Sequence, residues 1–340
     1  MWLLRSGSAA TPAQSFEAES GTIGGGAITV ADATASSTRT VKFTQTNGVV
    51  FTAAGDHGYT ADSETTMNEV AGSGSAFYLA LGDLSYNAGD ERQWCETFKS
   101  KFNDVELLAG NHDVGESAGG DINLYRQACP FTLGKLTGDY GKQYYFDYPQ
   151  TGPAMARFIM ITPGIKGSLT IDYDSGGAGY TFTSNAIDTA RAAGIKWIIV
   201  GMHKNCINAG TKSCEVGTDI MNLLITKRVD LVLQSHDHNY QRSHALSCLQ
   251  VVVVKASCIA DNGNDNAYVK GVGPVIVING EFGKGFYDVN PTDSEVGYFA
   301  KLDSTTFGIN KYTITDTTLR GKYLRSSGGS FADNFTIRAQ

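Results

Sequence analysis

Five short, largely apolar runs constrain the fold of this 340-residue chain more than any other feature, because each of them stops at polar residues. They span residues 49–54, 79–81, 105–109, 197–200 and 229–234. Runs of this length with a polar end are typical of buried strands. In open α/β sheets the loops that leave the strands converge at the carboxyl ends, where ligands bind. We therefore expect the polar residues after these runs to form one site.

The polar residues after the runs form five motifs. In chain order these are Asp56-His57-Gly58, Gly82-Asp83-Leu84-Ser85-Tyr86, Gly110-Asn111-His112-Asp113, Gly201-Met202-His203 and His236-Asp237-His238. They contain five of the six histidines of the chain, and most of the other polar members carry side-chain oxygens. Imidazole and carboxylate groups are ligands of iron, zinc and manganese. The sequence therefore predicts a transition-metal site.

This series of motifs resembles the metallophosphoesterases, and Tyr86 makes the purple acid phosphatases the most similar group. The resemblance extends over residues 48–325. It implies an α/β fold in which two mixed β-sheets pack face to face with flanking helices, the αββα metallophosphoesterase sandwich. Each motif alone is weak, but their order is specific.

The resemblance also implies the metal ligands. Seven residues match them: Asp56, Asp83, Tyr86, Asn111, His203, His236 and His238. Asp83 would bridge two ions, since one carboxylate can bind both. The first ion, with Asp56, Tyr86 and His238, is expected to be Fe(III) because Tyr86 offers a phenolate. The remaining neutral ligands suit divalent Zn, Fe or Mn.

The activity implied by the resemblance is hydrolysis of phosphomonoesters, in which a hydroxide on the metals attacks phosphorus in line. His112 would act as the general acid that protonates the leaving alkoxide, and Asp113 would orient His112. His57 is a weaker candidate for a phosphate contact. Ser235 stands where the family usually has glycine before its His-x-His pair, so we expect its side chain to narrow the site.

Each motif also has a simpler explanation. A single histidine at a strand end is more often a hydrogen-bonded structural residue, and Asp56 or Asn111 alone could be a turn or capping residue. Two other functions remain open: a non-catalytic exported carbohydrate-binding or surface protein on the same scaffold, and a phosphodiesterase or nucleotidase of the same superfamily.

Charge and cysteine content restrict the partners and the compartment. The net charge of -7 offers no basic surface for nucleic acid, and we expect no membrane span, so a small phosphate ester is the expected partner. The simplest pairing of the six cysteines joins sequence neighbours: Cys95 with Cys129, Cys206 with Cys214, and Cys248 with Cys258. Three disulfides predict a secreted or extracellular protein, although no signal peptide is present in this chain. Free thiols in a cytosolic enzyme are the alternative.

The chain is expected to contain three regions. Residues 1–14 are predicted to be a disordered leader, residues 15–46 a short β segment, and residues 47–340 the catalytic domain. The β segment resembles the start of a carbohydrate-binding module, which implies a weak carbohydrate contact. Within the catalytic domain we predict helices at residues 63–70, 91–102, 185–193 and 217–227, and a second sheet from strands at residues 251–254, 274–280, 298–304, 309–315 and 319–324.

Overall fold

The computed structural model describes residues 27–31, 39–43 and 48–340, and the chain divides into two compact units, residues 1–48 and 49–340. In the first unit, strands β1 (Ala27–Ala31) and β2 (Arg39–Phe43) pair in antiparallel fashion. The leader predicted at residues 1–14 lies outside the described residues.

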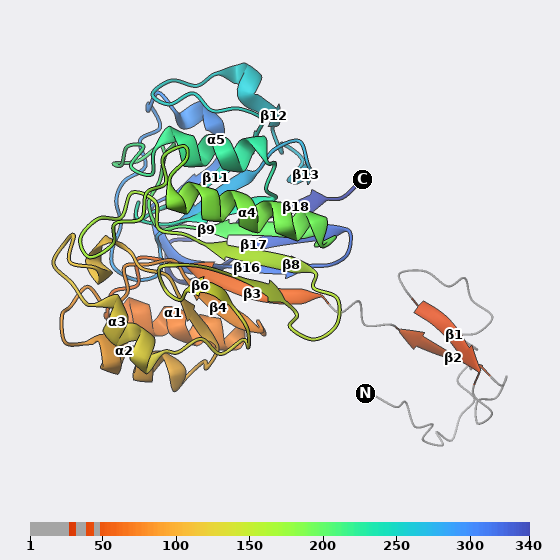
Figure 1. The fold of residues 1–340 in the computed structure, drawn as a ribbon, viewed down its shortest axis with the longest axis horizontal. Helices are drawn as coiled ribbons and strands as arrows, with labels where there is room; N and C mark the ends of the chain where they lie inside the picture. Colours follow the sequence, from red (N-terminus) through yellow and green to blue (C-terminus); the bar gives the residue numbers. More distant parts are fainter. Residues whose placement is uncertain (1–26, 32–38, 44–47) are drawn as a thin grey trace. The chain divides into compact units, whose positions relative to one another are not determined.

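The second unit is built on two mixed sheets (Figure 1). The seven-stranded sheet, in the order β13-β18-β17-β16-β3-β4-β5, contains β3 (Val49–Ala54), β4 (Phe77–Ala80), β5 (Val105–Leu107), β13 (Ala267–Val269), β16 (Thr306–Ile314), β17 (Thr318–Gly328) and β18 (Asn334–Arg338). The nine-stranded sheet has the order β12-β11-β14-β10-β9-β8-β7-β6, and β15 also pairs with β11. Its strands are β6 (Thr137–Asp139), β7 (Gln143–Tyr148), β8 (Ala156–Met160), β9 (Trp197–Gly201), β10 (Leu231–Gln234), β11 (Tyr240–Leu246), β12 (Ile259–Asp261), β14 (Val275–Asn279) and β15 (Phe299–Asp303).

Aromatic side chains join the two sheets face to face. Phe51 on β3 meets Phe158 on β8 with ring centroids 4.9 Å apart, and Phe77 on β4 meets the same ring at 5.1 Å. Both pairs are T-shaped, an arrangement that aromatic rings prefer. These residues are buried in the larger of two apolar clusters, so the main core lies between the sheets.

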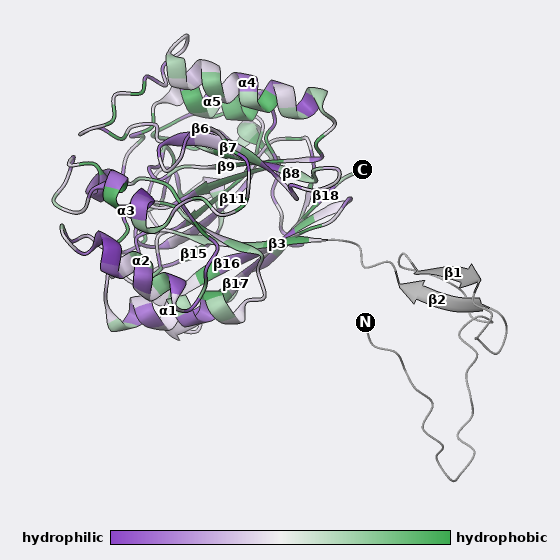
Figure 2. Ribbon diagram, turned by 60° about the horizontal axis from the view of Figure 1, so that its bottom comes forward, coloured by the Kyte–Doolittle hydropathy of each residue, from purple (hydrophilic) through white to green (hydrophobic). Residues whose placement is uncertain are grey.

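Helices cover the outer faces of both sheets, which confirms the predicted αββα arrangement (Figure 1). On the side of the seven-stranded sheet lie α1 (Ala61–Gly72), α2 (Glu91–Lys99) and α3 (Ile122–Ala128); on the side of the nine-stranded sheet lie α4 (Ala178–Ala192) and α5 (Thr218–Thr226). In the described part of the chain, 3-10 turns cover Asn111–Asp113, Ala256–Cys258 and Val296–Tyr298. Hydrophilic residues predominate on α1, α2 and α3 (Figure 2). No helix among the described residues has the length and apolar character that crossing a bilayer requires.

Local sequence explains where the first helices form. Thr60 caps α1, because its side chain accepts the N–H of Ser63 at 3.1 Å and the Ser63 hydroxyl bonds back to the Thr60 backbone. The helix predicted at residues 91–102 forms as α2 but ends at Lys99, and its Trp94 and Phe98, four residues apart, are both buried. α4 is longer than predicted and starts at Ala178, because threonine and glycine in its first turns hide the apolar period. The short α3 was not predicted.

One predicted strand is absent, and the predicted sheet membership of two others is wrong. Residues 251–254 form a bend, because Val252 has a left-handed φ of 73° and its N–H bonds to a Glu295 carboxylate at 2.5 Å. The last third of the chain also does not form one sheet. β14 pairs in parallel with β10, and β15 pairs with β11, so both belong to the nine-stranded sheet. β16, β17 and β18, together with the short β13, belong to the other sheet.

The predicted cysteine pairing is confirmed. The structure contains the disulfides Cys95–Cys129, Cys206–Cys214 and Cys248–Cys258, so all six cysteines, which lie in its described part, are paired. The second disulfide closes the loop that follows β9, immediately after His203. It therefore restrains a segment that carries a predicted ligand.

Candidate metal centre

Both sheets contribute residues to the candidate site. β3, β4 and β5 run parallel in the seven-stranded sheet and lead to Asp56, Asp83 and Asn111. β9 and β10 run parallel in the nine-stranded sheet and lead to His203 and the His236-Asp237-His238 motif. The structure brings all seven predicted ligands together through the contacts described below.

Four of these residues have a left-handed backbone. The φ angles are 58° at Asp56, 52° at Asp83, 65° at Tyr86 and 68° at His236. The described residues contain only seven non-glycine positions with positive φ, so the site holds more than half of them. Such conformations cost on the order of 1–3 kcal/mol each and cluster at functional sites, where the surrounding structure enforces them. Here they turn side chains back towards a common centre.

Asp56, Tyr86 and His238 form one compact group. The Tyr86 hydroxyl donates to Asp56 Oδ1 at 2.8 Å and lies 3.0 Å from His238 Nε2, which is itself 3.3 Å from Asp56 Oδ1. Burial favours the neutral form of Asp56, but His238 outweighs it and lowers the pKa of that carboxyl. Three potential ligand atoms of different chemistry therefore face one point.

Asp83, His203 and His236 form the second group. Their potential ligand atoms all lie within 4.8 Å of one another, and all three residues are buried. Asn111 Oδ1 lies 3.1 Å from His203 Nε2, which is 3.3 Å from Asp83 Oδ1. Burial lowers the pKa of His203, but Asp83 more than compensates and raises it to about 9. The donor set fits a divalent cation.

Hydrogen bonds fix the orientation of the two imidazoles. Nδ1 of His203 lies 2.9 Å from the Leu81 carbonyl oxygen, which can only accept, so Nδ1 carries the proton and Nε2 is left for a metal. Nε2 of His236 lies 3.0 Å from Glu215 Oε1, which leaves Nδ1 of that ring. The hydrogen bond to His236, together with Lys204, lowers the pKa of Glu215 to about 2 despite its burial.

The glycine of the Gly-Asn-His motif has a packing role. A Cβ atom on Gly110 would lie 2.1 Å from Asp83 Oδ1 and 2.4 Å from the Asp83 nitrogen. No real Cβ makes such contacts, so only glycine lets β5 bring Asn111 beside Asp83.

Asp113 does not orient His112 as predicted. Its carboxylate accepts the backbone N–H groups of Asp83 at 2.8 Å, Leu84 at 3.1 Å and Gly110 at 2.8 Å. Nδ1 of His112 bonds instead to the Ala118 carbonyl oxygen. The buried Asp113 carboxylate therefore holds the backbone of the loop in place. The Ala118 carbonyl is the group that orients His112.

The structure also corrects two expectations about neighbouring residues. His57 is fully buried, its Nε2 lies 2.7 Å from the Tyr78 hydroxyl, and burial lowers its pKa to about 4, so it is not a phosphate contact. Ser235 does not narrow the site. Its hydroxyl donates to the Leu81 carbonyl at 2.7 Å and lies 2.9 Å from His203 Nδ1, on the side of the ring away from Asn111.

Sequence reasoning missed Glu215, Lys204 and Ala118. Glu215 and Lys204 lie outside the five motifs. Ala118 contributes its backbone carbonyl, so its residue type gives no signal. Their only signal was position: Lys204 follows a ligand directly, and Glu215 follows a disulfide cysteine.

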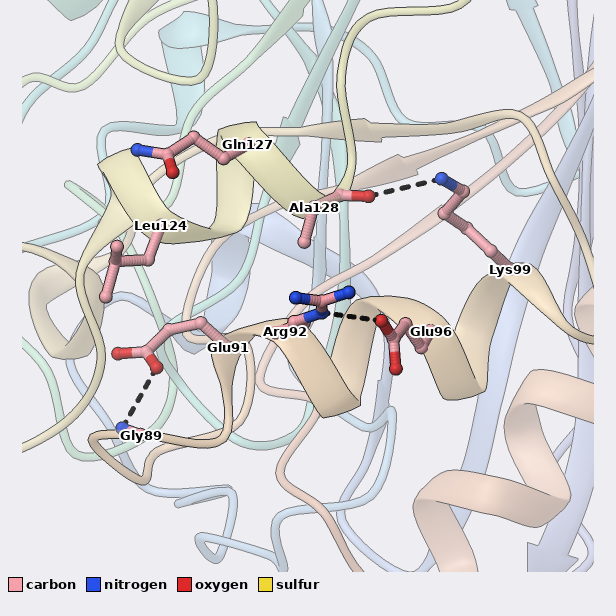
Figure 3. Close-up of a pocket in the computed structure, with 8 residues that line it drawn as sticks. All are labelled: Gly89, Glu91, Arg92, Glu96, Lys99, Leu124, Gln127 and Ala128. Carbon is pink, nitrogen blue, oxygen red and sulfur yellow. Dashed lines mark hydrogen bonds and ion pairs between the residues drawn. The ribbon is translucent and has the colours of Figure 1, made fainter.

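A cavity of about 650 Å³ between α2 and α3 is separate from the candidate site (Figure 3). Its charged side chains are engaged with neighbours, since Arg92 pairs with Glu96 at 2.7 Å and Lys99 donates to the Ala128 carbonyl at 3.2 Å. None of the seven ligands lines it.

Comparison with known proteins agrees with this geometry. The profile of the family described as calcineurin-like phosphoesterase matches residues 50–240, more than half of the chain and all five motifs. The chain belongs to this family. Calcineurin-like phosphoesterases bind a dinuclear metal centre, and in this chain the buried group of Asp83, His203 and His236 could hold a metal ion.

Within the calcineurin-like phosphoesterases, this chain is similar to plant purple acid phosphatases. Purple acid phosphatase 1 of Ipomoea batatas is 25% identical over 232 residues, which cover 62% of this chain and 46% of the relative. Probable inactive purple acid phosphatase 24 of Arabidopsis thaliana is 23% identical over 285 residues, covering 76% and 42%. The chain thus spans under half the length of these relatives.

The fold is also similar to that of a solved purple acid phosphatase, PPD1 from seeds of yellow lupin (Lupinus luteus). The TM-score is 0.68 at 19% identity, and the match covers 87% of this chain and 54% of the lupin chain. At this identity the likeness shows the fold alone.

Proposed function

We propose that this chain is a two-metal phosphoesterase of purple acid phosphatase type that hydrolyses small phosphomonoesters. The observation that carries the proposal is the placement of Asp83 and Tyr86. The Asp83 carboxylate lies beside His203, and Tyr86 Oη lies between Asp56 and His238, so the side chains offer two adjoining sets of ligands. We assign the activity to residues 47–340 and propose, from the three disulfides, that the protein is exported.

In this proposal Asp56, Tyr86 and His238 hold Fe(III), while Asn111, His203 and His236 hold a divalent Zn, Fe or Mn ion, with Asp83 shared. When bound, two such ions supply positive charge for the phosphoryl oxygens and lower the pKa of a water molecule. The protein contributes a rigid, mostly buried ligand set, because every ligand follows a core strand.

His112 is proposed as the group that protonates the leaving oxygen. Its Nδ1 faces the Ala118 carbonyl and so carries a proton, while Nε2 lies 4.0 Å from Asp83 Oδ2 at the edge of the centre. The side chain is 27% exposed, which leaves Nε2 accessible to a bound ester. A proton on Nε2 can therefore pass to an alkoxide as the bond to phosphorus breaks.

The test is the His112→Ala variant, assayed on an alkyl and an aryl phosphate with metals saturating. Turnover of the alkyl ester should fall by about 10² to 10⁴, the usual contribution of a general acid, and the aryl ester should lose less because its oxygen departs without a proton. Metal content should be unchanged. His244→Ala is the matched control, since Nδ1 of His244 also faces a carbonyl oxygen, that of Asn262, away from the seven ligands.

Other outcomes of this test have definite meanings. Equal slowing of both esters would make His112 a phosphate contact. Loss of a metal ion would make it a ligand. A wild-type protein that binds two ions but hydrolyses no ester would favour the non-catalytic alternative.

A further inference from the structure

A buried lysine next to the metal centre is not used by the proposed mechanism. Lys204 directly follows His203, and its side chain is only 4% exposed. Its Nζ lies 2.9 Å from Glu215 Oε2 and 2.6 Å from Glu116 Oε1, so one ammonium group joins two carboxylates from different loops. Burying such a charge is costly unless it is paired, and both partners are therefore needed.

One of these carboxylates reaches a ligand from the nine-stranded sheet. Glu215 uses Oε1 for His236 Nε2 at 3.0 Å and Oε2 for Lys204. Its backbone N–H also bonds to the Asn205 carbonyl at 3.0 Å, so this contact joins the two residues that flank the Cys206–Cys214 disulfide loop. Lys204 thereby limits the directions that Glu215 can take, and through it the direction of the His236 ring.

The other carboxylate reaches residues from the seven-stranded sheet. Glu116 begins a stretch of three residues without regular secondary structure that contacts the Gly-Asn-His motif. In that stretch, Ser117 Oγ accepts from Asn111 Nδ2 at 3.1 Å, which points Asn111 Oδ1 towards His203, and the Ala118 carbonyl holds His112 Nδ1. Glu116 is fixed at its side chain by Lys204 and by the Lys166 N–H at 2.6 Å.

We propose that Lys204 is a positioning residue that sets groups from both sheets at once: His236 through Glu215, and Asn111 with His112 through Glu116 and residues 116–118. The inference rests on the proposed two-metal centre and adds to it a link between the second ion and the general acid. Lys204 itself touches neither the ligands' donor atoms nor substrate, so its effects have to appear through two separable routes.

The test compares Lys204→Met with Glu215→Gln and Glu116→Gln. Metal affinity is measured by competition with a chromophoric chelator, and kcat and KM for an alkyl phosphate are measured with metals saturating. Lys204→Met should lower the affinity for the more weakly held ion by about 10- to 100-fold, the usual effect of losing a hydrogen-bonded partner of a ligand. It should also lower kcat. Glu215→Gln should lower metal affinity and leave kcat unchanged, whereas Glu116→Gln should lower kcat through His112 and metal affinity through Asn111.

Lys227→Met is the matched control, because Lys227 pairs with Asp188 at 2.6 Å on the surface, and it should change neither quantity. If Tyr86 binds Fe(III) as a phenolate, the protein should show a visible phenolate-to-iron absorption band. This band should persist in Lys204→Met, since none of these contacts involves Tyr86. Wild-type affinity and kcat in Lys204→Met would overturn the inference and leave the proposed function intact. A wild-type protein without bound metal would overturn both.

If Lys204→Met does not fold, the two glutamine variants decide. They keep the shape of the carboxylates and remove one charge each. A loss confined to affinity in Glu215→Gln, with a loss of turnover in Glu116→Gln, supports the link. A loss of turnover in Glu215→Gln as large as that in Glu116→Gln, or no loss in either variant, overturns it.

Discussion

The two halves of the candidate metal centre differ in chemistry and in how they are held. The seven-stranded sheet supplies only oxygen donors, Asp56, Asp83, Tyr86 and Asn111, and the nine-stranded sheet supplies only imidazoles, His203, His236 and His238. Three of the four oxygen donors, Asp56, Asp83 and Tyr86, have left-handed backbones, and the carboxylates of Asp56 and Asp83 lie close to the main chain at Gly280 and Gly110. The imidazoles that meet Asp83 are oriented instead by a backbone carbonyl, a serine and a glutamate.

This difference follows from side-chain length and symmetry. A short carboxylate is aimed by its backbone, so its direction depends on φ and on glycines that allow close approach. An imidazole has two nitrogens, and the proton on one must be fixed before the other can bind a metal. The oxygen half should therefore be sensitive to backbone changes, and the imidazole half to the loss of polar neighbours.

The largest effect is expected from Asp83→Ala, because Asp83 is the one carboxylate shared between the halves. The variant should lose both metal ions, as measured by metal analysis after dialysis, and all phosphatase activity with them. Asp188→Ala, at an exposed carboxylate paired with Lys227, should keep both ions. Retention of both ions by Asp83→Ala would place the centre elsewhere.

Gly110→Ala should be nearly as damaging although it removes no donor. The new methyl group would lie 2.1 Å from Asp83 Oδ1, so Asp83 has to move, and we expect metal affinity to fall by on the order of 10². Chelator competition measures the loss. Gly72→Ala, with no atom within 4 Å of the added carbon, is the control; an equal response in both variants would exclude the steric explanation.

Ser235→Ala tests the imidazole half and should have a smaller effect. It removes one of two hydrogen-bonding partners of His203 Nδ1 and leaves the Leu81 carbonyl. Since a single hydrogen bond contributes about 1 kcal/mol, affinity should fall by no more than about tenfold. Ser100→Ala, which removes a similar bond to a carbonyl at the exposed end of α2, should leave affinity unchanged. A loss as large as that of Gly110→Ala would mean that the halves do not differ.

Glu106, a buried carboxylate on the same seven-stranded sheet, can be compared with Asp83, because no histidine offsets the cost of burying its charge. Burial raises the pKa of Glu106 on β5 to about 7, whereas His203 and His112 outweigh burial at Asp83 and lower its pKa. The fold thus favours neutral Glu106. The resulting contribution to the free energy of unfolding is complete below about pH 4.5 and is lost as pH rises through about 7. The free energy of unfolding should fall by roughly 3 kcal/mol over that interval from this group.

Glu106→Gln should remove that part of the pH dependence, and denaturant unfolding at pH 5 and pH 8 measures it. The variant keeps an acceptor for the Thr132 hydroxyl, which lies 2.8 Å from Glu106 Oε1. Metal affinity should not change. A pH dependence identical to that of the wild type would show that Glu106 is ionised throughout.

The sequence predicted the layered fold and the convergence of the seven candidate ligands, because these depend on apolar runs and on the residue type at each strand end. The cysteine pairing was predicted as the simplest one, between sequence neighbours. It did not predict how two sheets share the ligands. β14 pairs with β10 and not with the strands that come after it in the chain. That pairing depends on tertiary contacts, which local sequence patterns do not reveal. The left-handed angle at Val252 was hidden for the same reason, since a glutamate 43 residues away enforces it.

The roles within the site were harder to predict than its members. Asp113 beside His112 suggested a pair, but its carboxylate turns to three backbone N–H groups. His57 beside Asp56 suggested a phosphate contact, but an aromatic core encloses it. Adjacent residues in a tight turn point in different directions, so sequence proximity does not decide which side chains share a task.

The aromatic contact between the sheets has a consequence for coordination chemistry. Phe51 and Phe158 set how far apart β3 and β8 lie, and the ligands of the two halves are attached to these same two layers. The distance between an oxygen donor and an imidazole therefore depends in part on the separation of the two sheets, which the size of the aromatic rings sets. Selection for a metal of different radius can act on phenylalanines that never meet the ion.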